Sequence, residues 1–344
     1  MHIPRASCFL FIGLFLSAGV CTGAHAQAAL LLQDADGIAE ALSPTGHESI
    51  YFARICAASP TRLRRCAPGE LGVVISRYHG IAGFDWLAMP LIPYLYAVED
   101  AAQVPAQVNR VTVQRLRVRY YDAHLRSLGP NVQQGGGVHR GWDQLVGAAY
   151  ERRIYAFRFE TTEAQDEAFI ARMNDGANHS HFNIFFRNCA DFTGTVLNFY
   201  FPHTFRRRIV PDGGIETPRQ VAYELARYGG KHPEIHLTVM EIPLVPGFHH
   251  SSRLGKSAAE SMVVTGYVIP IAVLSPIAAG VILADDLAWG RYPLPLKQAQ
   301  VLAPKEMAQL GSAIRTQATT QTSTANLPGG FQSGSGKMQT AAIR

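Results

Sequence analysis

The feature that most constrains this chain is a stretch of 24 residues without a charged side chain, Ser261 to Ala284, which lies between Glu260 and Asp285. Most of its residues are apolar, and a helix that spans a bilayer needs about 17–25 such residues. The stretch therefore predicts a C-terminal transmembrane segment. Pro270 and Pro276 favour a kinked span or a re-entrant hairpin, because membrane helices tolerate proline better than soluble ones. A buried apolar segment is the alternative.

The N-terminus has the features of a secretory signal peptide. Arg5 is followed by an apolar run from Cys8 to Val20, and Ala24-His25-Ala26 is a small-x-small cleavage site before Gln27. We therefore expect an exported, periplasmic protein. A lipid anchor at Cys21 is the weaker interpretation, because the residue before that cysteine is not small.

Removal of the signal would also remove Cys8 and Cys21 and leave three cysteines, an odd number in an oxidising compartment. Cys56 and Cys66 have nine residues between them and can close a small loop. A disulfide there is expected to stabilise the fold by about 2–4 kcal/mol, mainly by restricting the unfolded chain. Cys189 is then the unpaired thiol.

The formal charge of +5 is modest for 344 residues, and a nucleic-acid-binding protein would usually be more basic. We expect no nucleic-acid partner. Clustered arginines in an exported protein are compatible with contact to anionic lipid or cell-wall polymer, and a solvated basic surface is the alternative. The clusters are Arg62/Arg64/Arg65, Arg115/Arg117/Arg119 and Arg206/Arg207/Arg208.

Hydrophobic patterning predicts a mixture of strands and helices. The expected strands are Ser49–Ile55, Leu71–Ser76, Phe84–Met89 and Arg153–Glu160, and the first two should form a hairpin whose long tip is closed by the disulfide. The expected helices cover residues 108–128, 163–173, 189–200 and 218–228, although Val111-Thr112-Val113 alone would also suit a strand. Thr162 with Gln165, Asn188, and Pro218 are the signals for three of the helix starts.

These elements divide the chain into four parts. Residues 1–26 are the expected signal peptide, 27–255 the folded domain, 256–286 the transmembrane segment and 287–344 a polar, largely disordered tail. From Gly311 onward the tail has almost no large apolar residue with which to offset its ordering entropy.

Cys189 has the setting of a reactive thiol. It lies one position after the expected cap Asn188 and two after Arg187. The N–H groups and partial positive charge of a helix N-terminus stabilise a thiolate. A buried, inert cysteine is the alternative.

A thiol enzyme also needs a base, which is commonly histidine and need not be close in sequence. Among 13 histidines, His47 is preferred because Thr45-Gly46 precedes it and a strand follows. A turn there would present its ring at the end of the sheet. A surface-loop histidine is the alternative.

Taken together, Gly46-His47 before an early strand and Asn188-Cys189 at the start of a later helix resemble the circularly permuted papain-like thiol hydrolases. This group includes permuted NlpC-type enzymes and the lecithin:retinol acyltransferase group. In it the His strand comes first and the Cys helix last, commonly as Asn-Cys followed by an apolar helix. The resemblance covers roughly Leu42 to Phe201.

The resemblance implies an α+β fold, with an antiparallel sheet packed against helices, and a thiol acyl-transfer site. Cys189 would be the nucleophile and His47 the base, and N–H groups near Cys189 would stabilise the oxyanion. A third polar residue should orient the imidazole. Ser76, His79 and Asp85 are possible, and His79 is preferred. Polar residues beside the two motifs are candidates for substrate contact: Asn188, Asn183, Glu48 and Tyr51.

The remaining motifs are weak, and we expect no metal and no cofactor. His232, His236 and His249-His250 have no cysteine or carboxylate at helical spacing and suit solvated loops. Gly135-Gly136-Gly137 lacks the lysine or acidic partner of a nucleotide-binding loop.

The sequence thus predicts an exported, membrane-tethered cysteine hydrolase or acyltransferase. It would act on an amide or ester acyl group of a membrane lipid, a lipoprotein or a cell-wall peptide. A catalytically silent binding domain of the same fold and a structural membrane-associated protein are the alternatives.

Overall fold

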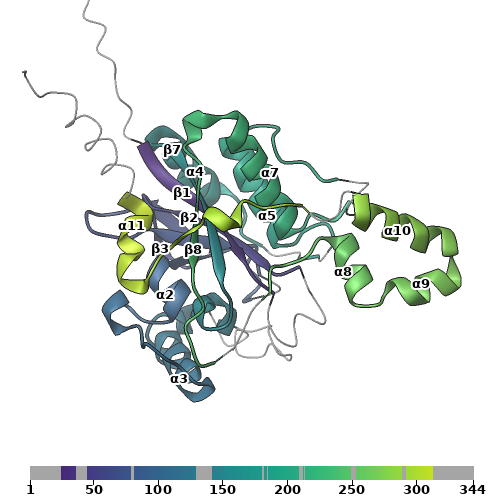
Figure 1. The fold of residues 1–344 in the computed structure, drawn as a ribbon. Helices are drawn as coiled ribbons and strands as arrows, with labels where there is room; N and C mark the ends of the chain where they lie inside the picture. Colours follow the sequence, from purple (N-terminus) through teal and green to yellow (C-terminus); the bar gives the residue numbers. More distant parts are fainter. Residues whose placement is uncertain are drawn as a thin grey trace, which may run out of the picture.

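The computed structural model describes residues 25–35, 45–78, 81–128, 142–179, 182–183, 185–208, 212, 214–248, 253–288 and 292–312. Its centre is a seven-stranded sheet with the order β6-β5-β2-β1-β7-β8-β9 (Figure 1). All neighbouring strands are antiparallel except β8 and β9, which are parallel, so the sheet is mixed rather than antiparallel. The strands are β1 His25–Gln33, β2 His47–Phe52, β5 Val73–Ser76, β6 Leu87–Pro90, β7 Ile154–Thr162, β8 Thr238–Ile242 and β9 Gln300–Val301.

Strand β1 is the central strand, and no strand was expected there. It pairs with β2 on one side and with β7 along nine residue positions on the other. Residues 28–32 are fully buried, and alternate side chains enter the core on opposite faces of the sheet. A strand buried on both faces has no polar alternation, which is why its sequence lacks the period of two.

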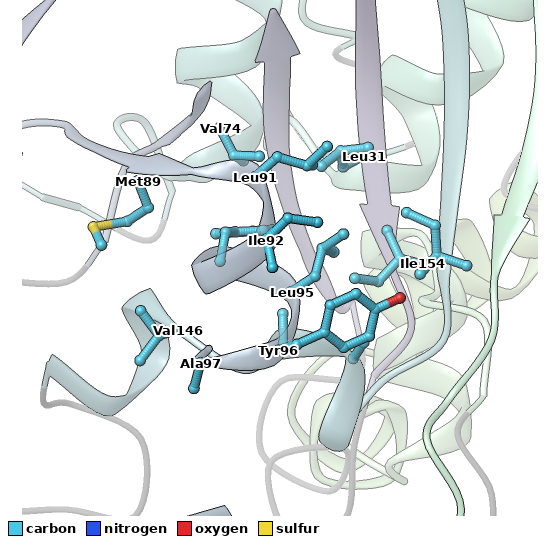
Figure 2. Close-up of a cluster of buried hydrophobic side chains, with 14 of the residues drawn as sticks. Leu31, Val74, Met89, Leu91, Ile92, Leu95, Tyr96, Ala97, Val146 and Ile154 are labelled. Carbon is cyan, nitrogen blue, oxygen red and sulfur yellow. The ribbon is translucent and has the colours of Figure 1, made fainter. Parts of the chain in front are cut away.

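Helices cover both faces of the sheet. One face carries α4 Glu163–Asp175, α5 Cys189–Tyr200 and α7 Pro218–Lys231, and the other carries α2 Leu91–Tyr96, α3 Arg110–Tyr120 and α11 Met307–Ser312 (Figure 1). We call the core between the sheet and α2, α3 and α11 the main core. Figure 2 shows part of it, in which Leu31 of β1, Val74 of β5 and Leu91 of α2 come together. Short helical turns lie at Ala101–Gln103, Tyr121–Leu125, Arg126–Leu128, Trp142–Leu145, Ala148–Tyr150, Pro233–Ile235, Leu296–Gln298 and Pro304–Glu306.

The predicted helix starts are confirmed. Thr162 and Gln165 form a reciprocal capping box on α4, Asn188 and Asp191 form one on α5, and Pro218 is the first residue of α7. The predicted helix at 108–128 is also confirmed, so the strand alternative at residues 111–113 is wrong. Helix α7 passes through Gly229, where a Cβ would lie 2.5 Å from the side chain of Leu237. Close packing, rather than helix termination, explains that glycine.

The Cys56–Cys66 disulfide is confirmed, but it lies in a separate hairpin. Strands β3 Ile55–Ser59 and β4 Arg62–Arg65 form a separate two-stranded sheet. It is inserted in the sequence between β2 and β5. The predicted pairing of the first two strands is confirmed, since β2 pairs with β5.

The predicted transmembrane segment at 261–284 is wrong. The stretch folds as three short helices, α8 Ala258–Val264, α9 Val268–Leu274 and α10 Pro276–Ala288. Among the described residues, every helix is too short or too polar to cross a bilayer. Gly266, at a φ of 78°, and Pro276, which has no N–H for the preceding turn, separate the three helices.

Residues 292–312, which were expected to belong to the polar tail, include β9 and α11. Leu302, Met307 and Leu310 are buried in the main core. The expected tail from residue 313 onward and Gly135-Gly136-Gly137 lie outside the described residues, as does the expected signal peptide through Ala24.

Candidate active site

Cys189 is the first residue of α5, and among the described residues it is the free cysteine. The Asn188 side chain accepts a hydrogen bond from the Asp191 N–H, and the Asp191 carboxylate accepts one from the Asn188 N–H. Asn188 also donates its side-chain amide to the Glu216 carbonyl oxygen. The helix start that carries the thiol is therefore fixed by side chains on both sides of Cys189.

Cys189 as a residue is half-buried, and its thiol group lies inward. Burial, and to a lesser extent the Glu48 carboxyl group, raises the pKa of Cys189 to about 12. Hydrogen bonding by the backbone of Glu48, Ala190 and Cys189 lowers the pKa but does not offset burial. The resting side chain is thus a neutral thiol surrounded by backbone donors.

Glu48 lies on the same face of the sheet as α5. Its side chain is fully buried and accepts a hydrogen bond from the Thr193 hydroxyl, one turn into the helix. Burial raises its pKa well above the usual value, and Glu216 adds to the effect. Glu48 therefore anchors β2 to α5 through a buried carboxyl group.

His47 begins β2, directly before Glu48. Gly46, which precedes it, has a φ of 77°, and a Cβ at that position would lie 2.4 Å from the Gln33 carbonyl oxygen. Only glycine lets the chain turn so close to β1. The expectation that this turn presents His47 at the end of the sheet agrees with the structure.

The His47 ring is held by two neighbours across the strand pair. Its Nε2 lies 2.9 Å from the Ser76 hydroxyl, and the ring stacks on Tyr78 with centroids 5.1 Å apart. Burial, and to a lesser extent the charge of Arg152, lowers the pKa of His47 to about 3. The imidazole is therefore neutral at physiological pH.

The Ser76 hydroxyl settles the tautomer of this imidazole. It donates to the Glu48 carbonyl oxygen at 2.7 Å, which uses its single proton. It must then accept from His47, so Nε2 carries the ring proton. The other ring nitrogen, Nδ1, is left with the lone pair that a general base requires.

The structure places Cys189 near the start of β2. It lies beside Glu48, the residue that follows His47 in the sequence. Helix α5 packs on β2, and the backbone of Glu48 hydrogen-bonds the thiol. Tyr78, which stacks on His47, is close enough to Cys189 for a thiolate to raise the tyrosine pKa. The two rings and the thiol thus share one end of the sheet, although His47 and Glu48 belong to opposite faces.

The three candidates for the orienting residue have different positions. Ser76 contacts His47 directly. Asp85 forms ion pairs with Arg77 at 2.8 Å and with Arg187 at 3.2 Å on the α5 face. His79, the preferred candidate, lies outside the described residues. Ser76 is therefore the residue for which the geometry supplies evidence.

The candidates for substrate contact have internal roles in this structure. Asn188 caps α5, and Glu48 binds Thr193. The Tyr51 hydroxyl is buried and donates to the Leu71 carbonyl oxygen. The Asn183 side chain accepts from the N–H groups of Phe185 and Phe186.

A buried polar network behind His47 was not predicted. Tyr94 lies 2.8 Å from the Ser49 hydroxyl and also hydrogen-bonds Gln33 and Tyr78. Burial raises the pKa of Tyr78 well above its usual value and that of Tyr94 to about 12, and the charge of Arg152 partly opposes both shifts. The alternation of polar side chains along β2, His47 and then Ser49, was the available signal.

The predicted arginine clusters contain several ion-paired members. Arg207 pairs with Asp191 beside the Cys189 helix start, and Arg208 binds Glu224 at 2.9 Å. Arg117 is buried against Glu151 at 2.7 Å. Further pairs join Arg64 to Glu70 and Arg65 to Glu163 and Glu167. These pairs favour a structural interpretation of the clusters.

Among the described residues, one group resembles a metal site: Cys56, Cys66 and Glu70. Both sulfur atoms belong to the disulfide, so neither is a thiolate ligand. His232 and His236 instead contact Glu234 and Glu160, at 2.7 and 3.0 Å. His249-His250 lies outside the described residues.

Comparison of the chain with family models, curated proteins and solved structures gave no match.

Proposed function

We propose that this protein is a thiol-dependent acyl-transfer enzyme, a cysteine hydrolase or acyltransferase, with Cys189 as nucleophile and His47 as base. The observation that carries the proposal is the hydrogen-bond chain from the Glu48 carbonyl oxygen through Ser76 to His47. It leaves Nδ1 as the basic nitrogen at the end of the sheet where the Cys189 thiol lies. The order of the two motifs supports the same class through its resemblance to permuted papain-like hydrolases.

The proposed reaction starts from two neutral groups. As Cys189 Sγ bonds to the substrate carbonyl carbon, the thiol proton passes to His47 Nδ1. The N–H groups of Cys189 and Ala190, which now point at the thiol, can stabilise the oxyanion. The imidazolium then protonates the departing amine or alcohol as its bond to carbon breaks. The resulting thioester is cleaved by water in a hydrolase, or by a second alcohol or amine in a transferase.

The substrate would carry an amide- or ester-linked acyl group. Membrane lipids, lipoproteins and cell-wall peptides are the classes to test, because the N-terminal sequence predicts export. Ser76 would be the positioning residue, since it fixes the tautomer and touches the base rather than the reacting atoms.

A catalytically silent binding domain is the second candidate. The observation in its favour is the pKa of about 12 for Cys189, because such a thiol forms little thiolate at neutral pH. Chemistry at the thiol then depends on proton transfer during attack, and a silent domain would lack that transfer.

The two candidates differ in how Cys189 reacts with an activated ester at neutral pH. Burst acylation of Cys189 by p-nitrophenyl acetate, located by mass spectrometry, should slow about 100-fold or more in His47→Ala, which is typical for loss of a general base. His124→Ala removes an exposed histidine and should behave as the wild type. Acylation that is equally fast with and without His47 would sink the enzyme proposal.

Ser76 supplies a finer test of the same site. Ser76→Ala should slow acylation of Cys189 by about ten-fold or more, because Nε2 loses the partner that fixes the tautomer. Ser76→Thr keeps the hydroxyl and should restore most of the rate. Equal rates for the Ala and Thr variants would show that this hydrogen bond does not position the base.

A further inference from the structure

The strongest feature outside the site is a helical hairpin that extends away from the sheet. It consists of α9, the turn at Ser275 and α10, and we refer to residues 268–284 as the apolar hairpin. Figure 1 shows α9 and α10 at the side of the molecule, joined to the rest of the fold through α8. Helix α8, which connects the hairpin to the fold, is held in place by an ion pair between its Glu260 and Arg219 of α7 at 2.9 Å.

The apolar hairpin exposes large hydrophobic side chains over most of its surface. Exposure is greatest at the tip, where Leu274 is 88% exposed and Val273 and Ile277 are each 81% exposed. No residue of α9 is buried, and within the apolar hairpin α10 buries only Ala279. The other exposed members are Ile269, Val281 and Leu283.

This distribution favours a medium that surrounds the hairpin over a partner that covers one side. A helix that docks in a protein groove has one apolar stripe and one polar face, whereas a helix that is apolar all round belongs inside a core or in hydrocarbon. Between residues 268 and 284 the side chains carry no charge, and Ser275 is the one with a polar atom.

Three polar groups of Ser275, at the tip, form hydrogen bonds within the hairpin. The Ser275 N–H donates to the Ile271 carbonyl oxygen, the Ser275 carbonyl oxygen accepts from the Ala279 N–H, and the Ser275 hydroxyl accepts from the Ala278 N–H. Pro276 has no N–H to satisfy. Internal hydrogen bonds of this kind lower the cost of placing Ser275 in hydrocarbon.

The dimensions fit one leaflet. The seven residues of α9 and the nine residues of α10 within the hairpin, 276–284, extend about 10 and 14 Å at 1.5 Å per residue. The hydrocarbon core is about 30 Å thick, so one leaflet contributes about 15 Å. Tyr267 lies at the start of α9 and Asp285-Asp286 end the uncharged stretch on α10, where the chain would return to the polar interface.

We propose that the apolar hairpin inserts tip-first into one leaflet of a lipid bilayer and holds the folded domain at the membrane surface. The occupant is lipid hydrocarbon. A second copy of the chain, paired through the same hairpin, is the competing outcome. The proposal does not depend on the chemistry of Cys189.

Flotation of the full chain with phosphatidylcholine–phosphatidylglycerol vesicles tests the proposal. Leu274→Glu and Ile277→Glu should each reduce vesicle-bound protein at least about ten-fold, because a charge in hydrocarbon is costly. Val111→Glu is the matched control, since Val111 is a 65% exposed apolar residue of α3. Binding that is equal in all four proteins would overturn the proposal.

The depth of the tip gives a readout that is independent of the apolar run near the N-terminus. A fluorescent nitrobenzoxadiazole group is attached at Leu274→Cys, in a background where the other free cysteines are serine. Lipids with a nitroxide within the acyl chain should quench it, and aqueous iodide should not. Iodide quenching equal to that in buffer, or self-association lost in Leu274→Glu without vesicle binding, would contradict lipid insertion.

Discussion

At the scale of single residues, the most informative contrast is between His47 and Glu48. They are neighbours in sequence, yet the strand directs their side chains to opposite faces of the sheet. His47 binds Ser76 and stacks on Tyr78, whereas Glu48 binds Thr193 of the Cys189 helix. The two neighbours thus link β2 to different supports, Ser76 and Tyr78 on one face and the Cys189 helix on the other.

The low pKa of His47 makes a prediction about stability. Its folded-state pKa of about 3 is below the ordinary value of about 6.5, so the unfolded chain binds this proton first as the pH falls. The contribution of the neutral ring is complete above pH 6.5 and is lost between pH 6.5 and 3. His47→Gln should remove about 1–3 kcal/mol of the stability loss between pH 7 and 4.5, because each pKa unit corresponds to about 1.4 kcal/mol.

Urea unfolding at the two pH values measures this difference. His179→Gln, at an exposed histidine, provides the control and should keep the wild-type pH dependence. An unchanged pH dependence in His47→Gln would mean that the ring is not held neutral in the folded protein.

Sequence reasoning identified Cys189 and His47 as candidate residues, but it did not identify the contact between Ser76 and His47. Asn188-Cys189 has a local signal, because a capping residue before an apolar helix marks its start whatever the tertiary fold. The choice of Ser76 over His79 or Asp85 depends on strand register, and a shift of one residue moves a side chain to the other face. No local pattern fixes that register between β2 and β5.

At the scale of elements, the β3–β4 hairpin shows how an insertion is joined to the main fold. The Asn174 side chain of α4 accepts from the Leu63 N–H and donates to the Leu63 carbonyl oxygen, as a neighbouring strand would. Arg65 adds ion pairs to Glu163 and Glu167 of the same helix. The hairpin thus has one covalent link within itself and a separate polar attachment to α4.

The disulfide should contribute to stability mainly through the unfolded chain. Cys56 and Cys66 are ten residues apart, and closing a loop of this length is worth about 3 kcal/mol in the chain-entropy description. The double variant Cys56→Ala/Cys66→Ala should therefore lower the free energy of unfolding by about 3 kcal/mol in chemical denaturation.

Reductant provides the matched comparison for this prediction. It should destabilise the wild type by a similar amount and leave the double variant unchanged. Equal stability of the oxidised and reduced wild type would show that the unfolded loop is not the source of the stabilisation.

At the scale of the whole molecule, the pairing of strands that are distant in sequence is the feature that sequence patterns did not predict. The helix caps and the β2–β5 pair follow from local patterns, whereas the β1–β7 and β8–β9 pairs join residues more than 50 positions apart. The uncharged stretch at 261–284 met the compositional rule for a membrane span, but Gly266 and Pro276 divide it into helices of 7, 7 and 13 residues. Composition determines the medium that a segment prefers, and backbone breaks determine its shape.

Residues 292–312 should be part of the cooperative fold. Leu310 of α11 is fully buried in the main core, and α11 packs against β1. Leu310→Ala should cost about 2–5 kcal/mol, as large-to-small changes in cores do. Val301→Ala, at a 58% exposed position in β9, should change stability by less than about 0.5 kcal/mol.

Thermal unfolding of the two variants separates an integral C-terminal segment from a loosely attached one. A Leu310→Ala protein with the stability of the Val301→Ala protein would show that α11 contributes little to the core.

The central place of β1 has a consequence for how the chain reaches its native state. One edge of this strand is occupied by β2, which follows within about 20 residues, but the other waits for β7, more than 120 residues later in the chain. During synthesis, residues Ala28 to Leu32 therefore present unpaired backbone groups beside apolar side chains for as long as β7 is missing. Such an edge readily pairs with other chains. The aggregation risk from this edge should fall when residue 162 becomes available, so chains truncated before β7 should aggregate faster than chains that include it.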